Sequence, residues 1–160
     1  MNDYCQAVVN LCNDGTIPKD KPVLFVGISL GGMIAQQMIQ FVPEGYTIKA
    51  VITFGSPVTK PFDRKDIKVV RFADKKDNVP VLGEMNYIFG DKRKAKQLNA
   101  QEVIYEQGLS DDAKWIDVHG LSYISAECWS KYDFLGEEPG TNTLVTLDTL
   151  TYYEAPIIHK

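Results

Sequence analysis

The sequence lacks any run of about 18 apolar residues, the length that a helix needs to cross a bilayer. It also lacks an excess of basic residues, since its formal net charge is −4, which argues against nucleic acid as the main partner. Residues 1–4 carry no basic segment, and no apolar stretch follows them as it would in a secretory signal. We therefore expect a soluble, cytoplasmic protein without a transmembrane segment.

Cysteines are few, and the three that occur (Cys5, Cys12 and Cys128) have neither the close pairing nor the neighbouring histidine of a zinc or redox site. Free thiols in a reducing compartment are the better interpretation. Cys5 and Cys12 lie seven residues apart in a segment with helical spacing, so both are expected in the core. No metal site and no cofactor are expected.

Neither an internal repeat nor a low-complexity tract divides the 160 residues, which indicates one domain. The run at 23–26 is apolar without alternation, as in a strand that is buried on both faces. The spacing after Gly27 is helical up to Pro43, and β-branched segments follow. The expected elements are a helix at 3–13, a strand at 23–26, a helix up to residue 42, and strands at 48–54 and 68–72. Their order predicts an α/β fold with a mostly parallel central sheet flanked by helices.

The second half of the chain has weaker patterns. Residues 86–89 and 101–105 suit a hairpin around the basic segment 91–96, which favours a solvated turn, with contact to an anionic headgroup or phosphate as the alternative. Residues 125–132 have helical spacing. The Thr-rich stretch at 143–150 suits one more strand, in a tail that begins near residue 136.

One motif carries chemistry: residues 27–31 read Gly-Ile-Ser-Leu-Gly and join the expected strand to the expected helix. In this context a G-x-S-x-G pattern is typical of a nucleophile elbow, with Ser29 exposed on a strained turn. Gly27 and Gly31 are expected because side chains would clash in so sharp a turn. The amide of Leu30 would face an oxyanion. The alternative is a glycine-rich turn or phosphate loop, although the Gly-Lys-Ser/Thr ending of a P-loop is missing.

A serine nucleophile needs a base and an acid that orients the base. The chain has two histidines, and His119 is the candidate because His159 is the penultimate residue, where fraying is common. We expect a loop above the sheet to present His119, with a structural histidine as the alternative. Asp77 is the candidate acid because it follows a strand and lies between Ser29 and His119, in the order Ser, Asp, His.

The neighbouring carboxylates are expected on the surface, and Asp74 is the reserve acid. These surface candidates are Asp63, Asp66, Asp74 and Asp117.

Four separated segments in the same order resemble the class 3 lipases of the α/β-hydrolase superfamily. They are the elbow at 27–32, the strand and loop at 51–57, the strand and aspartate segment at 69–82, and the histidine segment at 119–134. The resemblance covers roughly residues 20–135. It implies hydrolysis of a small acyl ester or a lipid without a cofactor: Ser29 attacks, His119 shuttles the proton, and Asp77 orients His119.

The sequence departs from that family in two places. Ile28 precedes the serine, where these lipases usually carry histidine. Several strands precede the elbow strand in the family, and a loop among them supplies a second oxyanion donor, whereas here about one helix precedes it. We therefore expect a shortened hydrolase domain over 1–160, with a β-rich tail at 136–160.

The shortening also predicts an open sheet edge. A helix, the hairpin, the tail, a second copy or a partner subunit would cover it. The alternative function is a weak or inactive interaction module with this fold, or one part of an enzyme that a partner completes.

Overall fold

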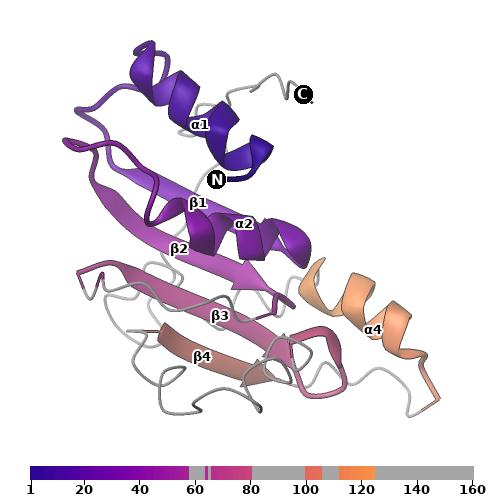
Figure 1. The fold of residues 1–160 in the computed structure, drawn as a ribbon. Coiled ribbons are helices and arrows are strands. Elements are labelled where there is room, and N and C mark those ends of the chain that lie inside the picture. Colours follow the sequence, from indigo (N-terminus) through magenta and orange to yellow (C-terminus); the bar gives the residue numbers. More distant parts are fainter. Residues whose placement is uncertain (58–63, 65, 81–99, 106–111, 125–160) are drawn as a thin grey trace, which may run out of the picture.

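A parallel sheet forms the middle of the protein (Figure 1). The computed structural model describes residues 1–57, 64, 66–80 and 112–124, together with the backbone of 100–105. In this part of the chain the sheet has four strands in the order β1-β2-β3-β4, all parallel. They are β1 (Val23–Ile28), β2 (Ile48–Phe54), β3 (Lys68–Asp74) and β4 (Ala100–Tyr105). The predicted α/β fold class is confirmed.

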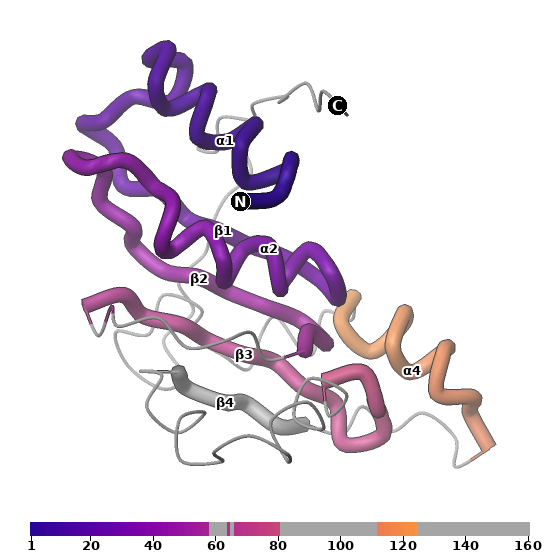
Figure 2. The backbone as a smooth tube through the Cα atoms, in the orientation of Figure 1, coloured from indigo at the N-terminus to yellow at the C-terminus, as the bar shows by residue number. Residues whose placement is uncertain are grey.

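The described helices are short and lie beside this sheet (Figure 2). They are α1 (Asp3–Asn13), α2 (Leu30–Met38), α4 (Trp115–Leu121) and the 3-10 turn η2 (Ser122–Ile124). Helix α1 begins where the Asn2 side chain accepts a 2.8 Å hydrogen bond from the backbone N–H of Cys5. No helix of the described residues is long and apolar enough to cross a membrane.

Cys5 and Cys12 are buried free thiols of α1, as predicted from their spacing. Burial raises the pKa of both thiols, so they remain protonated near neutral pH.

The two faces of the sheet bury different apolar clusters because side chains alternate along each strand. On one face, Val51 and Val69 pack against Ala35 and Ile39 of the α2 segment. The other face carries Ile52, Phe54, Val70, Phe72 and Tyr123. The rings of Phe54 and Phe72 stack there with centroids 5.0 Å apart. This second cluster fixes Tyr123 against the ends of β2 and β3.

Strand β1 is not buried on both faces as its apolar run predicts. In the described part of the chain it pairs with β2 alone, and Val26 and Ile28 are 51% and 46% exposed. The doubly buried strand is β2, which lies between β1 and β3. A short apolar run cannot distinguish an inner strand from an outer one, because that difference depends on pairing partners.

Other predicted boundaries differ in detail. Helix α2 ends at Met38, and the next residues form turns in which the N–H groups of Phe41 and Val42 donate to the Met38 carbonyl. The strand predicted at 101–105 is confirmed as β4, which runs parallel to β3. Several predictions lie outside the described residues: the hairpin partner at 86–89, the basic segment 91–96, the helix at 125–132, the strand at 143–150, and the positions of Asp63, Cys128 and His159.

Candidate active site

Ser29 forms the whole connection between β1 and α2, since the strand ends at Ile28 and the helix begins at Leu30. Its backbone has φ 51° and ψ −123°. Among the described residues that carry a side chain, Ser29 is the one with a positive φ. Such a conformation costs on the order of 1–3 kcal/mol and persists where the surroundings enforce it. The strained turn expected at the motif is therefore present.

The glycines near Ser29 differ in whether a side chain would fit at their positions. A Cβ on Gly27 would lie 2.3 Å from the carbonyl oxygen of Gly31, so a side chain is excluded there. Among the described residues, a Cβ on Gly31 would meet no atom outside its own helix within 4 Å, so the clash expected at that position is not found there. The second tight position is Gly32, where a Cβ would lie 1.8 Å from Oγ of Ser56. The close approach is to the loop after β2, which the local motif does not reveal.

Asp77 and His119 are in hydrogen-bond contact although 42 residues separate them. Nδ1 of His119 lies 2.8 Å from Oδ2 of Asp77, whose side chain is fully buried. The other carboxylate oxygen, Oδ1, accepts a 2.8 Å hydrogen bond from the backbone N–H of Val79. A buried carboxylate in this position favours the tautomer with the proton on Nδ1, which leaves Nε2 of His119 able to accept a proton.

Ser29 and this pair lie at the same edge of the sheet, where β1, β2 and β3 end. The N–H of Ser29 donates to the carbonyl of Phe54 at 2.9 Å, and the next residue, Gly55, donates to the carbonyl of Phe72 at 2.9 Å. Gly55 also borders the acid, since a Cβ there would lie 2.8 Å from Oδ2 of Asp77. Ligand sites of open α/β sheets occur at the carboxyl ends of the strands.

Two expectations about these residues need correction. His119 belongs to helix α4 and not to a loop, because the Gly120 that follows it is accommodated within the helix. Asp74 is 3% exposed and not a surface carboxylate. It accepts a 2.7 Å hydrogen bond from Oγ of Ser122, a residue 48 positions away. The expected exposure of Asp66 and Asp117 is confirmed.

Tyr123 is a member of this cluster that the sequence interpretation missed. Its hydroxyl donates a 2.5 Å hydrogen bond to Oδ2 of Asp77 and accepts a 3.1 Å hydrogen bond from the N–H of Asp74. The available signal was its position four residues after His119, a spacing that puts two residues on one side of a helical segment.

Leu30 occupies the first position of α2. The first amides of a helix have no carbonyl partner within the helix, and the helix dipole favours negative charge beside them. The oxyanion role expected for the Leu30 amide remains a prediction. The Leu30 side chain is 63% exposed.

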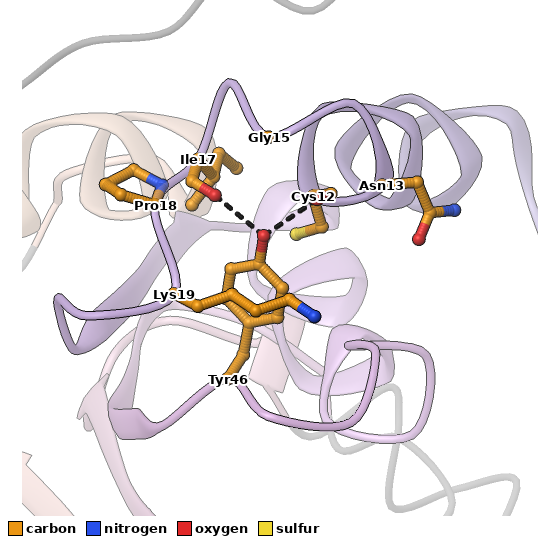
Figure 3. A pocket seen from close by; sticks show the side chains of 7 residues that line it. All are labelled: Cys12, Asn13, Gly15, Ile17, Pro18, Lys19 and Tyr46. Atoms are coloured by element: carbon orange, nitrogen blue, oxygen red, sulfur yellow. Dashed lines mark hydrogen bonds between the residues drawn. The ribbon is translucent and has the colours of Figure 1, made fainter.

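A separate hollow of about 280 Å³ lies at the opposite end of the strands (Figure 3). Its lining comes from the last two residues of α1, from the segment between α1 and β1, and from Tyr46, which precedes β2. The Tyr46 hydroxyl lies 2.8 Å from the carbonyl oxygen of Cys12 and 2.7 Å from that of Ile17. The Tyr46 O–H is shared between these two carbonyl oxygens, which holds the end of α1 and the segment after it in place. Tyr46 is not a member of the cluster around Asp77.

The described residues contain no group of three or more His, Cys, Asp or Glu side chains placed to hold a metal ion.

A family model described as "PGAP1-like alpha/beta domain" matches residues 1–125. The chain belongs to this family. The PGAP1-like match places the chain in the superfamily of lipase- and esterase-like hydrolase folds, as the motifs indicated, and it includes Ser29, Asp77, His119 and Tyr123. No match was found among curated proteins or among solved structures.

Proposed function

We propose that this PGAP1-like domain hydrolyses carboxylic esters through an acyl-enzyme, with Ser29 as the nucleophile, His119 as the base and Asp77 as its orienting acid. The observation that carries the proposal is the 2.8 Å hydrogen bond between Nδ1 of His119 and buried Asp77. This hydrogen-bonded pair lies at the edge of the sheet at which Ser29 forms a strained turn. A serine on such a turn, together with a histidine that a carboxylate orients, is the arrangement that serine hydrolases use for acyl transfer.

In the first half-reaction, Oγ of Ser29 forms a bond to the ester carbonyl carbon while Nε2 of His119 takes the hydroxyl proton. The tetrahedral intermediate then breaks its bond to the alcohol oxygen, which leaves with the proton from His119. Asp77 remains ionised and stabilises the imidazolium through Nδ1.

In the second half-reaction, a water molecule gives a proton to His119 and attacks the acyl-enzyme. The carboxylic acid leaves, and Ser29 recovers its proton from His119. No cofactor takes part in either half.

The oxyanion of both intermediates would accept a hydrogen bond from the Leu30 amide, the first N–H of α2. Loss of one such donor lowers kcat by about 100-fold to 1000-fold in enzymes of this kind.

An apolar acyl group is the substrate feature that the surroundings of Ser29 favour. The residues on both sides of the serine, Ile28 and Leu30, are apolar and 46% and 63% exposed. Exposed apolar side chains beside a nucleophile lower the cost of placing an acyl chain there. We therefore propose a small acyl ester or a lipid as the substrate, in line with the resemblance to class 3 lipases.

The test is hydrolysis of p-nitrophenyl acetate and p-nitrophenyl butyrate by the purified chain and by its Ser29→Ala variant. We expect release of p-nitrophenol by the parent chain, and a fall to background in the variant. Equal rates for the two proteins would contradict serine catalysis and favour a non-catalytic interaction module. Activity confined to an oligomeric fraction on size-exclusion chromatography would indicate that a second copy completes the site.

A further inference from the structure

Tyr123 and His119 share one oxygen atom of Asp77. The Tyr123 hydroxyl lies 2.5 Å from Oδ2, and Nδ1 of His119 lies 2.8 Å from the same atom. Both groups are donors towards an ionised carboxylate, so Oδ2 is held from two directions. The rings of Tyr123 and His119 meet edge to face, with centroids 6.2 Å apart.

The position of the Tyr123 hydroxyl is itself fixed by the backbone. It accepts a 3.1 Å hydrogen bond from the N–H of Asp74, the last residue of β3. The Tyr123 ring is 2% exposed and packs beside Phe54 at a centroid distance of 6.3 Å. A Cβ on Gly55 would lie 2.5 Å from this ring, so a glycine is needed to let the ring reach Asp77.

We propose that Tyr123 is a positioning residue that holds Oδ2 of Asp77 in place for His119 and, by sharing the carboxylate charge, sets how strongly His119 retains a proton. Its effect on ester hydrolysis rests on the function proposed above. Its effect on His119 does not, because the three side chains are already in contact in the free protein.

Burial, together with the neighbouring carboxylates of Asp77 and Asp74, raises the pKa of the Tyr123 phenol far above its ordinary value. The phenol therefore stays protonated, and remains a donor to Asp77, across the pH range in which a histidine titrates. Among the described residues, the titratable side chains whose contacts with Tyr123 or with its partners are given above are Asp74, the last residue of β3, Asp77, three residues after it, and His119 in α4.

Replacement of Tyr123 by phenylalanine keeps the ring and removes the donor. More of the carboxylate's negative charge is then available to His119, which favours the imidazolium form. The midpoint at which His119 titrates should therefore move to higher pH, by about 0.5 to 1 pH unit. The acidic limb of kcat/KM should move the same way, and kcat should fall by about tenfold with KM little changed, because Asp77 is less well oriented.

Histidine signals in NMR spectra give the most direct measurement, since the chain contains only His119 and His159. The His119 signal is assigned by its loss in a His119→Gln variant, and is then followed against pH in the parent chain, in Tyr123→Phe and in Ser122→Ala. Ser122→Ala is the matched control because it removes one hydrogen bond from the neighbouring buried carboxylate of Asp74 and leaves those of Asp77 intact.

We expect an upward shift in Tyr123→Phe and no comparable shift in Ser122→Ala. A midpoint that moves no further in Tyr123→Phe than in Ser122→Ala would overturn the proposal. If Tyr123→Phe does not fold, 3-fluorotyrosine at position 123 replaces it: a more acidic phenol is a stronger donor and should move the midpoint to lower pH, and no movement would overturn the proposal.

Labelling of the same samples with a fluorophosphonate separates this inference from the proposed function. An unlabelled parent chain would contradict serine hydrolysis, while the His119 titration would still decide whether Tyr123 acts on His119 through Asp77.

Discussion

The N–H of Ser29 donates a 2.9 Å hydrogen bond to the carbonyl oxygen of Phe54, which ends strand β2. The strained residue is therefore attached to the neighbouring strand at the point where its own strand ends. The Ser29 carbonyl, in turn, accepts from the N–H groups of Gly32 and Met33 in the first turn of α2. These contacts hold φ at 51°, a value that a residue with a side chain rarely adopts.

Relief of this strain should raise stability. Glycine tolerates a positive φ, so we expect Ser29→Gly to be more stable than Ser29→Ala by about 1 kcal/mol, which corresponds to a Tm higher by about 2–4 °C in a chain of this size. Differential scanning calorimetry of the two variants measures the difference. Both lack the hydroxyl, so the comparison isolates the Cβ atom. A lower Tm for Ser29→Gly would show that the turn is not strained.

Asp77 should contribute to catalysis through the charge of its carboxylate and not through the shape of its side chain. In Asp77→Asn the amide no longer selects the histidine tautomer with a proton on Nδ1, and we expect kcat for p-nitrophenyl butyrate to fall by about 10⁴-fold. Circular dichroism checks that the fold is retained.

Asp117→Asn is the matched control for this substitution, because it removes an exposed carboxylate from α4 and should leave kcat unchanged. A small loss in Asp77→Asn, similar to that in Asp117→Asn, would remove Asp77 from the proposed site.

Adjacent glycines of α2 should respond in opposite directions to alanine. In Gly32→Ala the new Cβ would lie 1.8 Å from Oγ and 2.6 Å from Cβ of Ser56, so the loop after β2 must move; we expect a loss of about 1–3 kcal/mol. In Gly31→Ala the new Cβ would meet no atom of the described residues outside its own helix within 4 Å, and we expect a gain of about 0.5–1 kcal/mol from helix propensity. Urea unfolding measures both changes. Equal destabilisation would contradict the contact between Gly32 and Ser56.

The sequence predicted the local elements well because their signals are local. The helix at 3–13, the strand at 48–54 and the strand-to-helix turn at Ser29 follow from apolar spacing and turn residues within one segment. The fold class followed from their order. Boundaries and burial were less accurate for β1, since exposure of Val26 depends on which strands pair beside it.

The parts of the candidate site that were missed depend on contacts between distant segments. Asp74 was expected on the surface because its partner Ser122 lies 48 residues away. Gly32 was passed over because its neighbour Ser56 belongs to the loop after β2. The spacing of Tyr123 from His119 does not reveal its contact with Asp77, which lies 46 residues away. Such pairings are set by the tertiary fold, and spacing along one element does not identify the distant partner.

Covalent labelling decides whether Ser29 is an activated nucleophile. The purified chain is treated with a fluorophosphonate probe, and the modified peptide is identified by mass spectrometry, beside Ser29→Ala, His119→Gln and a heat-denatured sample. We expect one adduct, on Ser29 of the folded chain, that is lost in Ser29→Ala and in the denatured sample and strongly reduced in His119→Gln. A folded chain that acquires no adduct, or acquires it equally with and without Ser29, would contradict this expectation.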